Sequence, residues 1–464
     1  MDATETELLP TLYHCPGEEH PISRSVHLSR LAAFYPKCRD CQHRGDTGHL
    51  PQQTVERIQS TEKRVQRPSL LTDEGVRGVY LNELTRQRAA RMAGAFASLL
   101  WEAAPLKGRL DSKTPHVKNR RQGPSIVIGQ DQRSSSPDIV LGVSAMLRRM
   151  GCQVIAVGLV TRPCFNFCVS HLEATAGILV TGSGCDQAWS GLDFVTKSAK
   201  PVSRFQAGST IKESESITLE DIETRAAEGF DRPTRNAGHQ RRFQASTPYE
   251  SGLWKHFHAL RPLRISCGCP VWILTKTLSR LFERLPCDLQ LIELPTRKRD
   301  LNSGDDPDIE VVAKHVLENQ SHLGLVIDDD GSRCRFIDDC GLPISDADAV
   351  CLIAALTHSD HAKTGISLQD GVRELVEPKL EEFLTNVYSA APFRRGLFES
   401  MLLNDSTIGV GDSAEIWFQE IIPTCDAILT LARMLQSLSQ SDTPLSELIS
   451  TYQAPTMDAD VDAE

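Results

Sequence analysis

A serine stands where a buried strand is expected to end. Ser183 follows the apolar run AGILV (176–180) within the small-residue turn Gly182-Ser183-Gly184. Such a turn can present a hydroxyl beside backbone N–H groups, and a hydroxyl activated by a neighbouring base acts as a nucleophile. The alternative is an ordinary turn serine with no chemical role. The turn would therefore place the Ser183 hydroxyl at the end of this strand.

A run of aspartates ends a second apolar strand, HLGLVI (322–327). Asp328 and Asp330 alternate along an extended segment, so their carboxylates are expected on one side of it. Mg²⁺ prefers oxygen ligands, often one or two carboxylates, and a hydroxyl such as that of Ser332 is a poorer ligand. Two carboxylates placed in this way are candidate ligands for a cation. The same letters also suit a plain acidic turn, which is the alternative.

The first 66 residues carry a separate group of metal-ligating side chains. Cys38 and Cys41 form a C-x2-C pair, Cys15 supplies a third thiol, and His20 or His14 is a candidate fourth ligand. Structural zinc takes four ligands of these types. Reduced thiols without a metal, or a redox pair, are the alternatives, because only one pair has standard spacing.

From about residue 68 onwards, strands alternate with helices, which predicts βαβ units and largely parallel sheets. Strands are expected at 124–130, 152–160, 176–182, 262–268, 288–295, 322–330 and 406–411. Helices are expected at 82–104, 135–151, 163–174, 275–286, 308–319 and 426–438. The expected fold class is α/β, with three serial three-layer (αβα) domains after a small Cys/His-containing segment.

The expected organisation has six parts. They are a Cys/His-rich segment at 1–66, an α/β domain with the serine loop at 67–205, a connecting segment with one helix (219–229) at 206–250, a second α/β domain with the aspartate loop at 251–345, a third α/β domain at 346–452, and an acidic tail at 453–464.

Five loops, in order along the chain, carry a family resemblance. They are TDEGVRG (72–78), GQDQRSSSP (129–137), GILVTGSGCDQAWSGLDFV (177–195), GLVIDDDGSRCRFIDDCG (324–341) and GVGDSAEIWF (409–418). Together, residues 68–452 resemble the α-D-phosphohexomutase family, the phosphoglucomutases and phosphomannomutases. In that family the first domain carries a serine loop of the form TASHNPxxYNGxK, the second a metal loop, DGDxDR, the third a sugar loop, GEESGH, and a fourth domain a phosphate clamp.

The resemblance implies a role for each matching residue. In the family, a phosphoserine donates its phosphoryl group to a sugar phosphate and takes the other phosphate back from the resulting bisphosphate, a transfer that depends on positioning and charge neutralisation. The residues so implied are Ser183, Asp131 and Arg133 for catalysis; Asp328, Asp330 and Ser332 for a weakened or lost Mg²⁺ site; and Arg77, Arg333, Asp412 and Ser413 for substrate binding. A hexose phosphate is the implied partner, and a protein partner is the alternative.

Several residues depart from the family pattern. Asp193 stands where the family has Lys, Asp329 where it has Gly, and Glu415 where it has His, and the clamp loop has no counterpart after PLSEL (444–448). We therefore expect a phosphohexomutase-like isomerase with impaired or lost mutase activity. The alternative is a non-catalytic scaffold that binds a sugar phosphate or a protein and carries an N-terminal zinc module. A dehydrogenase is disfavoured, because no unit opens with G-x-G-x-x-G.

Composition narrows the remaining classes. The chain has 464 residues, a net charge of -11 and a hydrophobic fraction of 40%, which is typical of a globular protein. A nucleic-acid binder is usually basic, so that class is disfavoured. No apolar run approaches the roughly 18 residues of a membrane span, and the acidic N-terminus is unlike a secretory signal. With 14 Cys spread over the whole chain, we expect a reducing cytoplasm.

Overall fold

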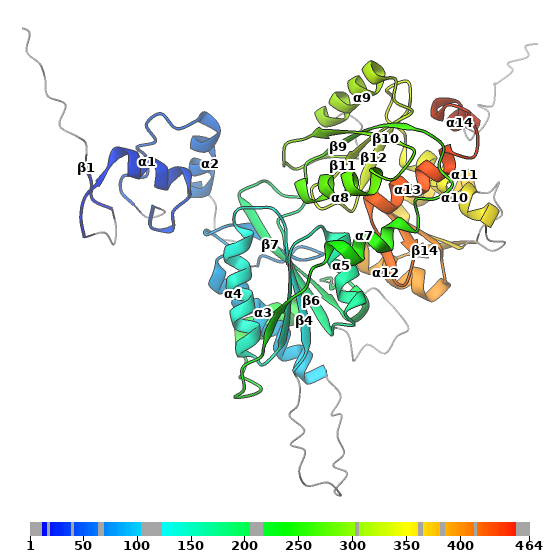
Figure 1. The fold of residues 1–464 in the computed structure, drawn as a ribbon. Coiled ribbons are helices and arrows are strands. Elements are labelled where there is room, and N and C mark those ends of the chain that lie inside the picture. The colour runs from blue at the N-terminus through cyan, green and yellow to red at the C-terminus, as the bar shows by residue number, and fades with distance from the viewer. Residues whose placement is uncertain are drawn as a thin grey trace, which may run out of the picture.

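The computed structural model describes residues 12–15, 19–38, 41–63, 69–103, 123–204, 217–301, 306–360, 365–380, 386–412 and 415–451. Within them, three α/β units follow one another along the chain after an N-terminal segment (Figure 1). The α/β fold class with αβα units in series is thus confirmed. The sheets are mixed, however, because each unit adds antiparallel strands at one edge.

The first unit is a six-stranded sheet with the strand order β3-β7-β6-β4-β5-β8. Its elements are β3 (Val76–Val79), α3 (Arg86–Ala103), β4 (Ser125–Gln130), α4 (Ser136–Arg149), β5 (Gln153–Leu159), α5 (Arg162–His171), β6 (Ala176–Val180), β7 (Trp189–Thr196), η2 (Lys197–Ala199), α6 (Leu219–Glu228) and β8 (Gln240–Arg242). Helices α3, α4 and α6 bury their apolar side chains in one core, and α5 packs in another. Strand β8 and helix α6, expected in a connecting segment, therefore pack with this unit.

Strand β7 is an element that the sequence pattern did not predict. It pairs antiparallel with β6 and with β3, and six of its eight residues are buried. Its sequence WSGLDFVT interrupts the apolar run with Ser190, Gly191 and Asp193, so neither alternation nor a continuous apolar run marks it as a strand. The buried Asp193 on this strand is important for the site described below.

The second unit has the strand order β10-β9-β11-β12. Its elements are α7 (Ser246–Trp254), β9 (Arg264–Cys269), α8 (Trp272–Phe282), β10 (Asp288–Glu293), α9 (Pro307–Asn319), β11 (Leu323–Ile327) and β12 (Cys334–Ile337). Strands β10, β9 and β11 are parallel, and β12 returns antiparallel to β11. The loop between β11 and β12 carries the run of aspartates.

The third unit has the strand order β14-β13-β15-β16-β17. Its elements are α10 (Asp346–Asp360), β13 (Gly365–Gln369), α11 (Asp370–Leu380), β14 (Asn386–Ala390), α12 (Phe393–Asn404), β15 (Ile408–Gly411), β16 (Glu415–Gln419), β17 (Pro423–Cys425), α13 (Ala427–Leu438) and α14 (Leu445–Thr451). Only β15 and α13 were expected as individual elements.

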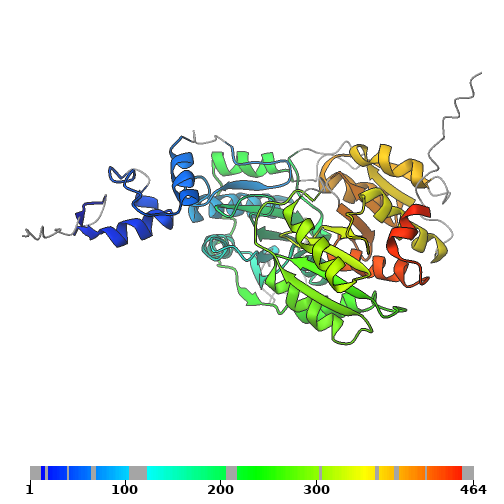
Figure 2. The ribbon, with the colours of Figure 1, turned by 90° about the horizontal axis from the view of Figure 1, so that it is seen from above.

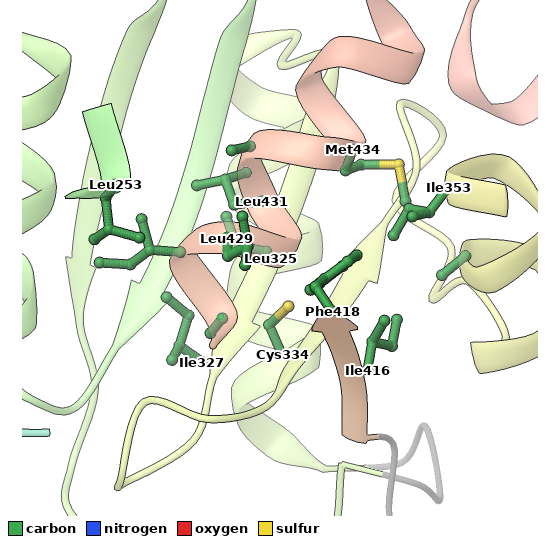
Figure 3. Close-up of a cluster of buried hydrophobic side chains, with 14 of the residues drawn as sticks. Leu253, Leu325, Ile327, Cys334, Ile353, Ile416, Phe418, Leu429, Leu431 and Met434 are labelled. Atoms are coloured by element: carbon green, nitrogen blue, oxygen red, sulfur yellow. The ribbon is translucent and has the colours of Figure 1, made fainter. Parts of the chain in front are cut away.

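Helix α13 joins the cores of the second and third units. Figure 3 shows its Leu429 beside Leu325 of β11, and its Met434 directed at Ile353 of α10, all within one buried cluster. Ten of its twelve residues are buried, as expected of a helix enclosed between two layers. Asp426 caps its N-terminus by accepting from the backbone N–H of Ile428 at 2.9 Å. Burial on opposite sides holds α13 between the two units.

The N-terminal segment extends away from the three units in both ribbon views (Figures 1 and 2). It contains β1 (Leu12–Tyr13), β2 (Ile22–Ser23), α1 (Arg24–Ala32), η1 (Pro36–Cys38) and α2 (Gln52–Lys63). Its apolar side chains form two small clusters that are separate from the main core. In the described part of the chain, no helix combines the length and apolarity that crossing a bilayer requires.

Candidate functional site

Ser183 faces the aspartate loop of the second unit. It follows β6, and its hydroxyl lies 3.1 Å from Oδ1 of Asp329 and 3.0 Å from Oδ2 of Asp330, to which it can donate. Both loops follow the carboxyl ends of parallel strands, the edge where ligands bind in open α/β sheets. The structure thus brings together the candidate nucleophile and the aspartate run.

Arg162 is a functional residue that sequence reasoning missed. Its Nε donates to Asp330 Oδ2 at 2.7 Å, and its Nη1 lies 2.6 Å from Asp193 Oδ2. Burial alone would raise the pKa of Asp330, but the Arg162 guanidinium holds that pKa well below its usual range. The available signal was the position of Arg162, since it opens α5 after β5 at the same sheet edge as Ser183.

Asp193 is enclosed by two guanidinium groups. Besides Arg162, it accepts from Nη1 and Nη2 of Arg77, at 2.5 and 3.1 Å. Burial opposes its ionisation, but Arg77 and Arg162 keep its pKa below the ordinary value. Arg77, implied as a substrate contact, is therefore committed to an internal carboxylate in this structure. The negative charge that Asp193 introduces in place of the family's lysine is therefore neutralised by Arg77 and Arg162.

Asp131 and Arg133 hold the serine loop in place. Asp131 accepts from the backbone N–H of Gly182 at 2.9 Å. Arg133 donates to the carbonyl oxygens of Asp186, at 2.6 Å, and Cys185, at 2.9 Å. Arg133 also reaches the second unit, with its Nη2 3.2 Å from Asp329 Oδ2. In this geometry the two residues position Ser183, and Arg133 adds positive charge beside it.

The oxygens of the aspartate loop already have partners. Asp328 accepts from the backbone N–H of Gly331 at 2.8 Å and from Arg333 Nε at 2.8 Å. Burial and the charge of Asp330 raise the pKa of Asp328 to about 7. Ser332 Oγ is buried and makes no hydrogen bond within the described residues. Across the described ranges, no group of three or more acidic, histidine or cysteine side chains is arranged to hold a metal ion. The implied magnesium ligands therefore do not fit the ion as they stand.

The third unit adds further ion pairs beside Arg162 and Asp193. Arg394 pairs through Nη2 with Glu415 at 2.7 Å, and its backbone N–H donates to Glu74 of the first unit at 2.6 Å. A cavity of about 30 Å³ lies beside Arg394, Glu74 and Arg162. Asp412 is exposed, at the end of β15. Ser413, the other implied sugar contact, lies outside the described residues.

The N-terminal thiols are buried close to one another. Cys15, Cys38 and Cys41 are each about 95% buried, and Cys15 is within hydrogen-bonding contact of Cys41. Burial and the neighbouring Cys41 raise the pKa of the Cys15 thiol. His20 and His14 are exposed. A thiol with a raised pKa is a poorer metal ligand until a cation displaces its proton.

Comparison with known proteins places these loops in context. The family model described as phosphoglucomutase/phosphomannomutase, alpha/beta/alpha domain I, matches residues 112–218. A phosphoglucosamine mutase from Leuconostoc mesenteroides is 25% identical over 394 residues, covering 81% of this chain and 79% of the relative. One from Corynebacterium jeikeium is 24% identical over 393 residues, covering 82% and 81%.

Two solved structures share the fold. A phosphoglucomutase/phosphomannomutase family protein from Burkholderia thailandensis superposes with a TM-score of 0.68 at 18% identity, covering 84% of this chain and 81% of its own. A putative phosphomannomutase from Thermus thermophilus gives a TM-score of 0.66 at 20% identity, covering 84% of each chain. The likeness therefore extends over all three α/β units.

Proposed function

Because this chain belongs to the α-D-phosphohexomutase family, we propose that it binds a hexose phosphate in front of Ser183, with impaired or lost mutase activity. The observation that carries this proposal is the contact of the Ser183 hydroxyl with Asp329 and Asp330. It joins the serine loop to the second unit as phosphoryl transfer through that serine would require. The relatives are named phosphoglucosamine mutases, so glucosamine phosphates are the first ligands to test.

Two features of the cleft support impaired transfer. Phosphoryl transfer needs unpaired positive charge for the incoming phosphate, but Arg77, Arg133 and Arg162 already bond internal groups. Transfer also needs a group that exchanges a proton with the sugar hydroxyl. Asp193 occupies the position of the family's lysine, and its pKa, lowered by Arg77 and Arg162, makes it a weaker base than an ordinary carboxylate. Loss of a general acid or base typically costs about 10²–10⁴ in rate.

The first test is phosphate on Ser183. The full chain is incubated with glucosamine 1,6-bisphosphate or glucose 1,6-bisphosphate and Mg²⁺, and Ser183 is examined by mass spectrometry beside the variant Ser183→Ala. We expect glucosamine 1-phosphate to bind in calorimetry, with turnover at least about 100-fold below that of the Leuconostoc relative. Turnover equal to that relative, with labelling at Ser183, would contradict impaired activity. If neither glucosamine 1-phosphate nor glucose 1-phosphate binds, the proposal that the chain binds a hexose phosphate is wrong.

A scaffold without catalysis is the second candidate. The observation that favours it is the internal pairing of the cleft's arginines: Arg77 and Arg162 pair with Asp193, and Arg133 pairs with Asp329. In that case, a protein or a sugar phosphate would bind on the outer face of the cleft. Labelling of Ser183 with turnover would rule out this candidate.

Zinc in the N-terminal segment stays a prediction, and Cys15, Cys38 and Cys41 would have to draw together to bind it, because the described thiols are not arranged around a metal site. What supports it is the mutual burial of Cys15, Cys38 and Cys41. Atomic absorption of protein purified without chelator is expected to give one zinc per chain, and the variant Cys38→Ser to lose it. The matched control is Cys340→Ser, which alters an exposed thiol elsewhere. Zinc-free protein whose melting temperature does not change with a chelator would refute the prediction.

A further inference from the structure

We infer that Arg162 occupies the place of a divalent cation between the serine loop and the aspartate loop, so that the positive charge at this cleft is a built-in guanidinium. The inference uses the proposed function only to locate the cleft. Its test is cation binding, which does not depend on turnover, so the two can fail separately.

The first step is the position of the guanidinium. Asp330 Oδ2 receives both Arg162 Nε, at 2.7 Å, and the hydroxyl of Ser183, at 3.0 Å. A magnesium ion shared by this carboxylate and Ser183 would bind the same oxygen at about 2.1 Å. Arg162 and the ion would therefore occupy overlapping volume. The side chain of Arg162 is only 11% exposed, so it has little space to move aside.

The second step is the support that fixes Arg162. Its backbone N–H donates to the carbonyl oxygen of Asp330 at 3.0 Å, and Thr161 caps α5 by accepting from Cys164 N. The far side of the guanidinium pairs with Asp193 at 2.6 Å. Arg162 thus contacts the second unit through its backbone and its side chain, and it also pairs with Asp193 of its own unit. Displacing it would leave Asp193 with Arg77 alone in a buried setting.

The third step is the state of the remaining oxygens. Both carboxylate oxygens of Asp328 and both of Asp330 accept from guanidinium, hydroxyl or backbone donors. Magnesium requires near-octahedral oxygen coordination and releases its waters reluctantly. Binding it here would break several of these hydrogen bonds at once. The carboxylates that the family resemblance assigns to a metal are neutralised by Arg162 and Arg333 instead.

The experiment is a Mn²⁺ titration of the full chain, followed by electron paramagnetic resonance. We expect the wild-type chain to show no saturable binding at this cleft up to about 1 mM. The variant Arg162→Gln should bind at least about tenfold more tightly, and the double variant Arg162→Gln with Asp330→Asn should lose that gain. The matched control is Arg86→Gln, which removes an arginine of the same unit whose side chain is 54% exposed; it should behave as wild type.

Two results would overturn the inference. One is wild-type binding of Mn²⁺ that matches Arg162→Gln and disappears in Asp330→Asn. The other is a folded Arg162→Gln variant that binds no more tightly than wild type. Should that variant fail to fold, Arg162→Met, which keeps most of the side-chain length without the charge, takes its place with the same expected gain. The melting temperature supplies an independent readout, because a cation that binds the folded state raises it. We expect 10 mM MgCl₂ to change the melting temperatures of the wild-type chain and of Asp330→Asn by the same amount.

Discussion

The variant Asp193→Ala is expected to lower the free energy of unfolding by about 3–5 kcal/mol, because it leaves buried charges without a partner. The side chains of Arg77 and Arg162 are only 10% and 11% exposed, so water cannot replace the lost carboxylate. Arg162 retains Asp330, but Arg77 loses the carboxylate to which it donates twice. Urea denaturation followed by circular dichroism measures the change.

The matched control for this variant is Asp138→Ala. Asp138 also pairs with an arginine of the first unit, Arg86, but that arginine is 54% exposed. A pair with one exposed member contributes about 0–1 kcal/mol. Asp138→Ala also removes a hydrogen bond with Tyr80, so its total cost should be at most about 2 kcal/mol. Equal effects of the two substitutions would show that Asp193 is not the centre of a buried charge network.

The second large effect concerns the pH dependence of stability through Asp426. This carboxyl group is buried at the N-terminus of α13 and accepts from the hydroxyl of Tyr249 at 2.6 Å. Burial raises its pKa from 3.8 to about 6. The folded chain therefore holds a proton here that the unfolded chain has already released. The stabilisation is fully present below about pH 4 and is lost as the pH rises through 6. Each pH unit between the two pKa values corresponds to about 1.4 kcal/mol, so the loss is about 3 kcal/mol.

The variant Asp426→Asn isolates this contribution. Asparagine is also a good helix N-cap and carries no charge, so the variant should gain about 3 kcal/mol relative to wild type between pH 4 and pH 7.5. Tyr249→Phe supplies a second variant: it removes a hydrogen bond that lowers the pKa of Asp426, so the loss of stability should be larger and should extend to higher pH. Parallel stability profiles of wild type and Asp426→Asn would contradict the assignment.

The positions of the loops that form the site could be predicted from the sequence, but the ion pairs between their side chains could not. Ser183 and Asp330 each follow the carboxyl end of an apolar strand, which local pattern was sufficient to predict. The two strands belong to different sheets, so only the family resemblance indicated that the two loops share one cleft. Arg162 was not found, because a single arginine at a helix start carries no periodic signal. Its partners Asp193 and Asp330 lie 31 and 168 positions away along the chain.

Burial explains why the role of Asp193 was incompletely predicted. From the sequence alone, Asp193 places a negative charge where the family has the positive charge of a lysine. The structure encloses that carboxylate between Arg77 and Arg162, so its charge is cancelled locally. Strand β7, which carries it, was missed for a related reason: the polar residues that break its apolar run are themselves buried. Polar residues inside a core are satisfied by partners that sequence pattern does not reveal.

The enclosed position of α13 has a consequence for the order in which this chain is made. Residues 427–438 cover β11 of the second unit and α10 of the third (Figure 3), yet they leave the ribosome after nearly all of both. At about 5–20 residues per second, the hundred or so residues between β11 and α13 take roughly 5–20 seconds to synthesise. During that interval, the side chains of β11 that α13 later covers are exposed to solvent. Nascent chains stopped before residue 427 should therefore be the ones that chaperones retain.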